Sequence, residues 1–152
     1  MSMHKRPHGF TMIELLVAIV IVGIMAAVAM PRLKNGMARE SVRNARRAVV
    51  SQLSNARGAA SSRGCRAVFH IEAGTDPRVW VTSCMTTGAG LDTVGSVTHL
   101  ADKYGVTVSL AGDSLTFTPT GIGIGSGWMQ MRFGKASETD TLAISPLGQA
   151  RW

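Results

Sequence analysis

The stretch that decides the fold is His8-Gly9-Phe10-Thr11-Met12-Ile13-Glu14-Leu15-Leu16-Val17-Ala18, or HGFTMIELLVA. It opens an apolar run in which no charged residue follows Glu14 until Arg32. Residues 10–30 number 21. As an α-helix they span about 31 Å, which matches the roughly 30 Å hydrocarbon core of a bilayer. A carboxylate costs about 2.5–3.5 kcal/mol at the centre of a membrane and less near an end, so Glu14 is expected to have a function and a partner.

Two ordinary interpretations leave Glu14 unexplained. A cleaved secretory signal would use Lys5 and Arg6 as its basic start and residues 27–29, Ala-Val-Ala, as its cleavage site. The apolar part of such a signal is typically about 7–15 residues long, which is shorter than this run. A simple membrane anchor fits the length of the run but gives the carboxylate no partner.

Cleavage between Gly9 and Phe10 would supply that partner. The cut creates an α-amino group on Phe10, four residues before Glu14, so the two charges can pair within one chain or between neighbouring chains. These residues resemble the class III signal of type IV pilins and pseudopilins, with Pro31 at the end of the anchor. The resemblance implies that a prepilin peptidase cuts after Gly9 and methylates Phe10. It also implies that Glu14 registers each subunit against Phe10 of a neighbour.

A helical pattern continues after the anchor. Apolar residues recur at steps of three and four and predict one narrow, Ala-rich buried stripe. The stripe comprises Ala38, Val42, Ala45, Val49, Leu53, Ala56 and Ala60. Gly64 stands where a C-terminal cap is expected.

The positive charge of the chain is concentrated on this second helical segment. The net charge is +7, and residues 31–66 hold nine Lys/Arg against one acid, whereas residues 67–152 hold five against seven. The helix carries Arg39, Arg43, Arg46, Arg47 and Arg57 outside the apolar stripe. We interpret them as a solvated face, or one that meets lipid phosphates and neighbouring acids. Nucleic-acid binding is the alternative, although no aromatic residue lies among these arginines to stack on bases.

The periodicity changes to two after Gly64, which predicts a β-rich domain. Strands are expected at 65–71, 78–83, 97–100, 106–110, 114–118, 128–133 and 141–145, with 85–95 as a loop. Met129, Met131 and Phe133 form the expected core face of their strand. The glycine-rich segment 121–127 lacks the Lys-Ser/Thr of a phosphate-binding loop and is interpreted as a turn between strands.

The chain has two cysteines, Cys65 and Cys84. A hairpin centred on residues 74–75 would place them opposite each other, so we expect a disulfide in an oxidising compartment. Two buried free thiols are the alternative. Neither cysteine belongs to a Cys/His cluster of the kind that binds structural zinc, and no catalytic constellation is recognisable. We therefore expect no metal, no cofactor and no enzyme activity.

Two C-terminal segments resemble the GspH/FimT branch of the pilin family. They are residues 115–121, LTFTPTG, and residues 144–151, ISPLGQAR. The resemblance implies an α+β fold in which a long N-terminal α-helix, membrane-embedded in its first half, packs on a C-terminal antiparallel β domain. It implies a minor pilin or pseudopilin that primes or joins a type IV pilus or a type II secretion pseudopilus.

The same resemblance implies a domain order and a location. Residues 1–9 would be the leader, 10–30 the transmembrane helix, 31–64 a periplasmic amphipathic helix and 65–152 the β-rich domain. The protein would cross the bacterial inner membrane once, with its C-terminal domain in the periplasm, before it enters a pilus or pseudopilus. Its partners would be other pilins, the prepilin peptidase, the inner-membrane assembly platform and membrane lipid.

The alternative function is DNA binding during uptake in natural transformation. Some members of this branch bind DNA through a C-terminal Gly-Arg-x-Arg motif. The matching residues 148–151 read Gly-Gln-Ala-Arg, so Gln149 replaces the first arginine. The candidate DNA contacts are Arg132, Lys135, Arg151 and Trp152. The acids Glu138 and Asp140, close by in sequence, argue against this function.

Overall fold

The computed structural model describes residues 10–85, 89–112 and 114–152. The chain divides into two compact units, Met1–Gly36 and Met37–Trp152. Helix α1 (Met12–Arg63) contributes its first part to the one unit and its second part to the other. The leader expected at residues 1–9 lies outside the described residues.

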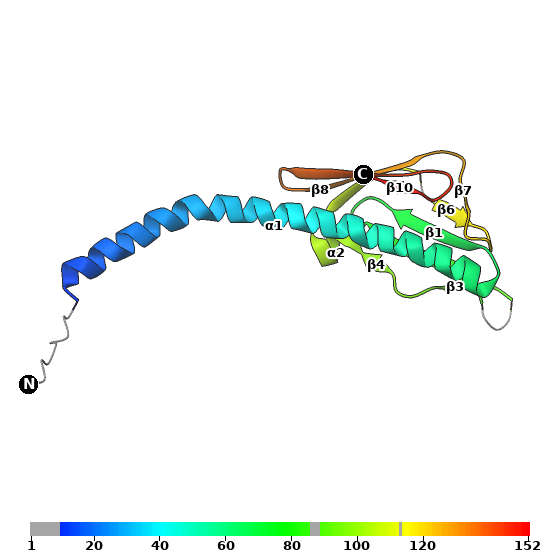
Figure 1. The fold of residues 1–152 in the computed structure, drawn as a ribbon, viewed down its shortest axis with the longest axis horizontal. Helices are drawn as coiled ribbons and strands as arrows, with labels where there is room; N and C mark the ends of the chain where they lie inside the picture. Colours follow the sequence, from blue (N-terminus) through cyan, green and yellow to red (C-terminus); the bar gives the residue numbers. More distant parts are fainter. Residues whose placement is uncertain (1–9, 86–88, 113) are drawn as a thin grey trace, which may run out of the picture. The chain divides into compact units, whose positions relative to one another are not determined.

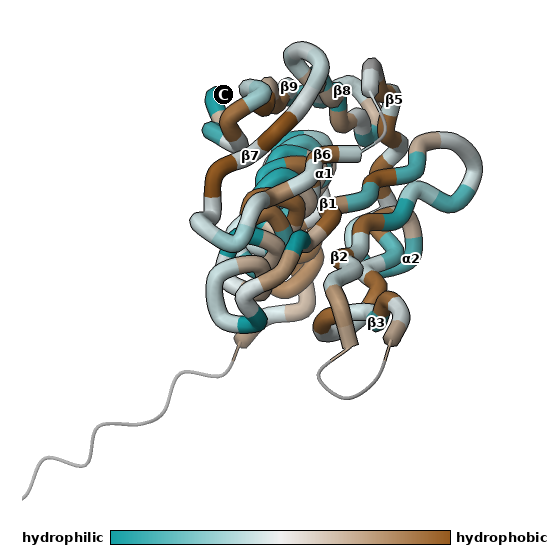
Figure 2. Tube along the Cα trace, turned by 90° about the vertical axis from the view of Figure 1, so that its right-hand side faces the viewer, coloured by the Kyte–Doolittle hydropathy of each residue, from teal (hydrophilic) through white to brown (hydrophobic). Residues whose placement is uncertain are grey.

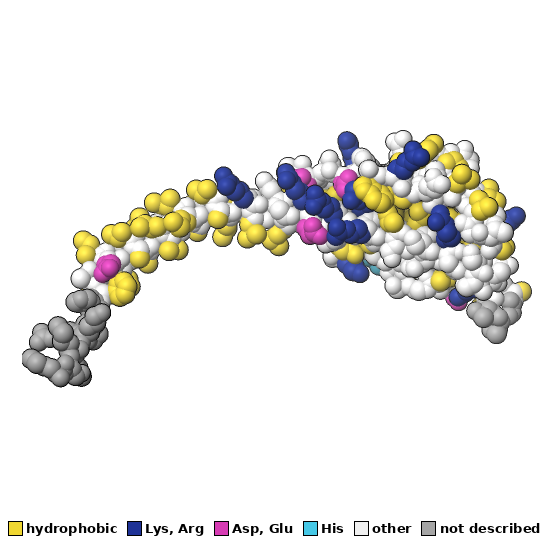
Figure 3. All heavy atoms as spheres, viewed as in Figure 1, with side chains coloured by type: hydrophobic (Ala, Val, Ile, Leu, Met, Phe, Trp, Pro, Cys, Tyr) yellow, Lys and Arg dark blue, Asp and Glu magenta, His cyan; other side chains and the backbone are white. Residues whose placement is uncertain are grey.

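In the first unit, α1 exposes its apolar side chains on all sides. Every described residue of this unit, from 10 to 36, is exposed, and hydrophobic side chains cover most of the surface that Figure 3 shows for it. The helix is long and apolar enough to cross a membrane. The expected anchor is therefore present in length and composition.

In the second unit, α1 buries the stripe that the sequence predicts. All seven residues of that stripe are at most 5% exposed, and Ala45, Val49, Ala56 and Ala60 are fully buried. All of them except Ala38 belong to one hydrophobic core together with residues of both sheets. Because most of the stripe is alanine or valine, the strands can approach the helix backbone closely. Gly64 follows the helix with φ 63°, the left-handed conformation expected of a C-terminal cap.

Two antiparallel sheets complete the second unit (Figure 1). The first runs in the order β3-β2-β1-β6-β7, with β4 also paired to β2. Its strands are β1 (Ala67–Glu72), β2 (Arg78–Cys84), β3 (Leu91–Thr93), β4 (Thr98–His99), β6 (Ser114–Phe117) and β7 (Gly123–Ile124). The second runs in the order β10-β9-β8-β5. Its strands are β5 (Thr107–Ala111), β8 (Met129–Lys135), β9 (Glu138–Ile144) and β10 (Ala150–Arg151). The α+β architecture expected from the sequence is thus confirmed.

The strands alternate between the core and the outside. Figure 2 shows this alternation along β1 and β2 as a change between hydrophobic and hydrophilic colours. Phe69 and Phe117 from the first sheet and Phe133 from the second are fully buried. Met129 and Met131 are 5% and 1% exposed, so the predicted core face of β8 is confirmed.

The predicted register of the first hairpin is wrong by one residue. Its strands pair Ala67 with Ser83 and Glu72 with Arg78, so the hairpin is centred on Thr75 and not between residues 74 and 75. Five residues connect the strands, whereas the sequence-based register assumed an even-numbered turn. Cys65 consequently lies before β1, at the corner between helix and strand.

Other differences concern short elements. The strand expected at 97–100 is cut to Thr98–His99, because Leu100 begins a five-residue helix, α2 (Leu100–Tyr104). Leu100 is fully buried, and its N–H donates to the carbonyl of Pro77 at 2.7 Å. The two- and three-residue strands β3, β7 and β10 were not expected, and β7 lies within the glycine-rich segment interpreted as a turn.

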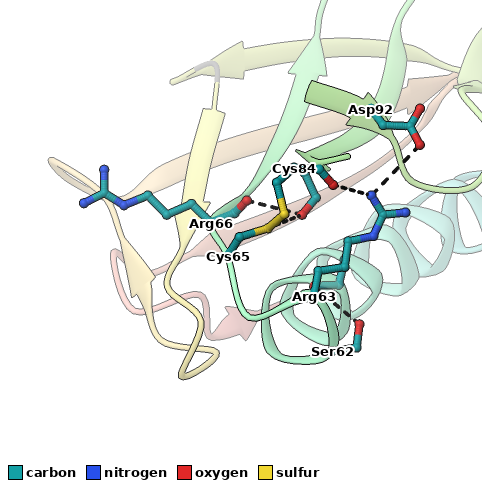
Figure 4. A network of polar contacts seen from close by, with 8 residues as sticks. Ser62, Arg63, Cys65, Arg66, Cys84 and Asp92 are labelled. Carbon is teal, nitrogen blue, oxygen red and sulfur yellow. Dashed lines mark hydrogen bonds and ion pairs between the residues drawn. A yellow bond between two sulfur atoms is a disulfide. The ribbon is translucent and has the colours of Figure 1, made fainter. Parts of the chain in front are cut away.

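The expected disulfide between Cys65 and Cys84 is present, despite the shifted register. Figure 4 shows the polar contacts around it. Arg63, the last residue of α1, donates from Nη1 to the carbonyl of Cys84 at 2.7 Å. Ser83 donates from Oγ to the carbonyl of Arg66 at 3.3 Å. The end of the helix is therefore tied to the end of β2 by one covalent bond and by hydrogen bonds.

Candidate functional site

Thr11 caps the first turn of α1. The N–H of Glu14 lies 3.3 Å from Thr11 Oγ1 and 3.1 Å from the Thr11 carbonyl. Thr-x-x-Glu is the sequence pattern of a capping box, which stops a helix from fraying at its start. The pattern can be read in the sequence, although no role for Thr11 was predicted from it. A carboxylate in the first turn is also favourable beside the positive end of the helix dipole.

Phe10 and Glu14, the residues expected to pair between subunits, are both exposed. Phe10 is 81% exposed, and Gly9 lies outside the described residues. No residue described within this unit forms an ion pair with Glu14. The start of α1 therefore offers a carboxylate and an uncovered apolar surface to whatever surrounds it, lipid or other helices.

The arginine face of the second unit is matched by acids of the same chain. Arg39 Nε lies 2.9 Å from Glu138 Oε1, and Arg46 Nη1 lies 2.7 Å from Asp140 Oδ2. Both acids are in β9, and Figure 3 shows basic and acidic side chains gathered together here. These pairs agree with the interpretation that the face meets neighbouring acids. The Arg39 side chain is largely exposed, whereas Arg46, Glu138 and Asp140 are half-buried, so water screens the second pair less than the first.

A hollow of ≈ 490 Å³ lies at this face. It is lined by Arg39, Val42, Arg43, Arg46, Arg47, Glu138, Thr139 and Asp140. Arg47 lies 3.5 Å from Glu40. Arg43 has no partner within residues 10–85, 89–112 and 114–152, so it is the arginine of this face that remains available.

The C-terminal segment is fastened to α1 through Arg57. Its guanidinium donates to the Gly148 carbonyl at 2.8 Å and lies 5.5 Å from the centre of the Phe117 ring. Gly148 has φ 80°, and a Cβ placed on it would lie 2.5 Å from Cε1 of Phe117. Glycine is therefore required here by both conformation and space. Nearby, the N–H of Gly123 donates to the Leu147 carbonyl at 3.3 Å, which joins β7 to the same segment.

Three of the four candidate DNA contacts lie together. Arg132, Arg151 and Trp152 line one hollow of ≈ 670 Å³ on the second sheet. The rest of its lining is Ser109, Leu110, Gln130, Met131, Thr141, Leu142 and Ala143. Trp152 is 73% exposed, and its ring lies 5.2 Å from the Arg46 guanidinium. The arrangement can present two cations and an indole face to an anionic, aromatic ligand.

Lys135, the fourth candidate, does not line this hollow. Its ammonium donates to Ser41 Oγ at 3.0 Å and to the Tyr104 carbonyl at 2.6 Å. Those bonds connect β8 to α1 and to the end of α2. Nothing in the spacing of the sequence signals this role, because it depends on how β8 lies against the helix.

Comparison with known proteins agrees with this architecture. Residues 4–30 match the family model for the prokaryotic N-terminal methylation motif. The fold is similar to that of the type IV minor pilin FimU of Pseudomonas aeruginosa, in two crystal forms. The first superposes with a TM-score of 0.55 at 17% identity, over 74% of this chain and 88% of that one. The second gives 0.51 at 18% identity, over 72% and 90%.

Proposed function

We infer that this chain, which is type IV pilin-like by its N-terminal methylation motif and by its fold, is a membrane-anchored subunit that assembles with other pilins. We further propose that it is a minor pilin or pseudopilin that primes or joins a type IV pilus or a type II secretion pseudopilus. The observation that carries the proposal is the methylation motif. It lies at the start of an apolar helix whose residues are all exposed throughout the first unit.

In the proposed mechanism the chain begins as a single-pass protein of the bacterial inner membrane. Residues 10–30 span the lipid, and the domain after residue 30 lies in the periplasm. The disulfide between Cys65 and Cys84 fits an oxidising compartment of that kind. A prepilin peptidase hydrolyses the bond between Gly9 and Phe10, and the new α-amino group of Phe10 receives a methyl group.

Assembly then depends on Glu14. Its carboxylate pairs with the Phe10 amine of a neighbouring subunit, which offsets the cost of holding both charges in a medium of low dielectric constant. The exposed apolar side chains of each helix pack against those of its neighbours as the assembly platform draws the subunit out of the lipid. The charge pair sets the axial register, and close packing of the apolar side chains holds the helices together.

The first test concerns the N-terminus. The full-length chain is produced in a bacterial inner membrane together with a prepilin peptidase, and its N-terminal peptide is analysed by mass spectrometry. We expect a chain that begins at N-methylated Phe10, and an uncut chain for Gly9→Leu, because the larger side chain obstructs cleavage. An intact Met1 terminus in the unaltered protein, or a cut after Ala29, would contradict the proposal.

The second test separates processing from assembly. Glu14→Gln removes the charge and keeps the shape, so we expect normal cleavage but little incorporation into sheared filaments. Glu40→Gln is the matched control, since Glu40 is another exposed acid of the same helix, and it is expected to assemble normally. Equal incorporation of both variants would rule out registration by Glu14.

DNA binding during uptake is the second candidate. The observation that favours it is the hollow shared by Arg132, Arg151 and Trp152. The Lys135 ammonium is hydrogen-bonded within the protein. DNA binding at the hollow would therefore rely on two arginines and one tryptophan. So few phosphate contacts would give weak binding with a shallow dependence on salt.

A further inference from the structure

A group of ionisable side chains gathers at one end of the first sheet, outside the arginine face and the C-terminal hollow. One ligand atom from each of Asp76, His99 and Asp102 lies within 4.8 Å of the others. His99 Nδ1 is 3.1 Å and 3.0 Å from the two carboxylate oxygens of Asp76. We propose that Asp76, His99 and Asp102 bind a divalent transition-metal ion, with Zn²⁺ as the ion that suits the ligand set.

The three residues come from three elements that buried contacts hold in place. Asp76 lies in the loop between β1 and β2, and His99 ends β4, which pairs with β2 through Arg78. Asp102 lies three residues after His99, in α2. The hydrogen bond from the Leu100 N–H to the Pro77 carbonyl joins that loop to the start of α2. Leu100 is fully buried, so the backbone beneath the three side chains is anchored in the core.

Helix α1 also holds the segment that precedes His99 in the chain. Gln52 of α1, which is 8% exposed, donates from Nε2 to the Ser96 carbonyl and to Thr98 Oγ1, each at 3.2 Å. These bonds fix the segment that leads into β4. The ligand-bearing backbone is therefore held from α1 as well as from β2.

No lysine or arginine in the described part of the chain forms an ion pair with this group, and the charge of Asp76 is the last and smallest of the causes that act on the pKa of Arg78. Among the described residues, Asp76 forms an ion pair only with His99, and Asp102 has no hydrogen bond or ion pair. Two carboxylates thus lie close to each other and to a single imidazole. A dication placed there would remove their mutual repulsion, which at such distances is of the order of 1 kcal/mol or more.

The nearby cations are engaged elsewhere. Arg78 donates from Nε to Glu72 Oε2 at 2.6 Å. That hydrogen bond, followed by the charge of the carboxylate, raises the pKa of Arg78. The Lys103 ammonium lies 5.6 Å from the centre of the Tyr104 ring.

The donor set selects the ion. An imidazole nitrogen favours zinc and its neighbours over calcium or magnesium, and two carboxylates complete a three-residue site with water as the fourth ligand. Ligand atoms of a tetrahedral zinc ion lie about 3.4 Å apart. The Asp76 oxygens lie slightly closer than that to His99 Nδ1, at 3.1 and 3.0 Å, and a ligand atom of the exposed Asp102 lies within 4.8 Å of both residues. On binding, the proton that Nδ1 donates to Asp76 is released to solvent, the metal takes the Nδ1 lone pair, and the ring keeps a proton on Nε2.

The site was not predicted from the sequence, because its residues form no Cys/His cluster along the chain. Asp76 and His99 are 23 residues apart in the chain, and the link between them exists only once β4 pairs with β2. The inference does not rest on the proposed role in filament assembly, since it concerns the folded second unit alone.

The test uses the full-length protein in detergent, titrated with ZnCl₂ by calorimetry and with CoCl₂ by visible absorption. We expect one micromolar site per chain, visible d–d bands with Co²⁺, and a higher Tm with Zn²⁺. His99→Gln and Asp102→Asn should each weaken binding at least tenfold. Tm without metal shows whether each variant has folded.

Two controls distinguish this site from others. Asp92→Asn changes an acid of β3 in the same sheet, and the double variant His4→Gln, His8→Gln removes the imidazoles of the N-terminal segment; both should bind as the unaltered protein does. Binding that survives His99→Gln and Asp102→Asn, or that is lost only with His4 and His8, would overturn the proposal. An absence of binding at millimolar Zn²⁺ would leave Asp76 and His99 as an ordinary surface ion pair.

Discussion

The guanidinium of Arg57 donates a hydrogen bond of 2.8 Å to the carbonyl oxygen of Gly148, 91 residues further along the chain. The donor belongs to α1 and the acceptor to the turn between β9 and β10. The bond therefore connects the helix to the segment that leads into Arg151 and Trp152. The same guanidinium lies over the Phe117 ring. A single side chain of the helix therefore contacts both the first sheet and the C-terminal turn.

Arg57→Ala should lower the free energy of unfolding by about 1–2 kcal/mol, since a charged hydrogen bond and a cation–π contact are lost together. Thermal unfolding of the full-length protein in detergent measures the change. Arg43→Ala is the matched control, because Arg43 is on the same helix and has no partner in the described part of the chain. It should change stability by less than about 0.5 kcal/mol. Equal effects of the two substitutions would show that the contact contributes nothing.

Gly148→Ala should be more harmful than Arg57→Ala. The added Cβ would lie 2.5 Å from Phe117 Cε1, and the backbone has a φ of 80° that alanine disfavours. We expect a loss of at least about 2 kcal/mol, measured by chemical unfolding. Gly127→Ala is the control, since nothing lies within 4 Å of its added Cβ. A Gly148→Ala protein as stable as Gly127→Ala would contradict the close approach described here.

Removal of the disulfide should cost about 3 kcal/mol in the chain-entropy account, given a sequence separation of 19. The double variant Cys65→Ser, Cys84→Ser tests this in a denaturant titration. The unaltered protein treated with dithiothreitol should lose the same amount, and the double variant should not respond to dithiothreitol. If reduction left the midpoint of the unaltered protein unchanged, the bridge would have no stabilising role.

If the chain binds DNA through its C-terminal hollow, Arg151→Ala should weaken binding about tenfold, or about 1.4 kcal/mol. The slope of log K against log salt should also become shallower by about 0.7, the value for one phosphate contact to a single strand. The measurement is a titration of the full-length protein with a single-stranded oligonucleotide at two salt concentrations.

Arg43→Ala serves as the control for that titration, since Arg43 is an available arginine outside the C-terminal hollow. Binding that weakens with Arg43→Ala and not with Arg151→Ala would move the contact to the arginine face of α1. DNA binding that neither substitution changes would exclude the C-terminal hollow as the DNA contact.

The sequence predicts best where one long element repeats a pattern. The stripe from Ala38 to Ala60 and the core face of β8 were both predicted, because burial follows the period of the element. The hairpin register was missed by one residue, since nothing local distinguishes a loop of five residues from an even-numbered one. That shift did not prevent the disulfide, because Cys65 lies in the bend before β1 and not in the strand itself.

Short elements and long-range partners were not predictable in the same way. Helix α2 has five residues, too few to show a helical period, and it depends on burial of Leu100. The strands β7 and β10 have two residues each and exist only because longer strands lie beside them. Arg46 was visible in the sequence as one basic residue among several. Its pairing with Asp140 required the position of β9 against α1.

The backbone hydrogen bond between Gly123 and Leu147 affects whether copies of this protein can aggregate through their sheet edges. β7 is the last strand of its sheet, and such a strand is a template on which a foreign strand can add. Here the chain's own turn already takes the Gly123 N–H, and a Cβ on Gly123 would lie 2.7 Å from the Gly148 nitrogen. Crowded copies therefore cannot extend their sheets through this hydrogen bond. In the proposed filament, contacts between subunits would then run through the helices and not through this sheet edge.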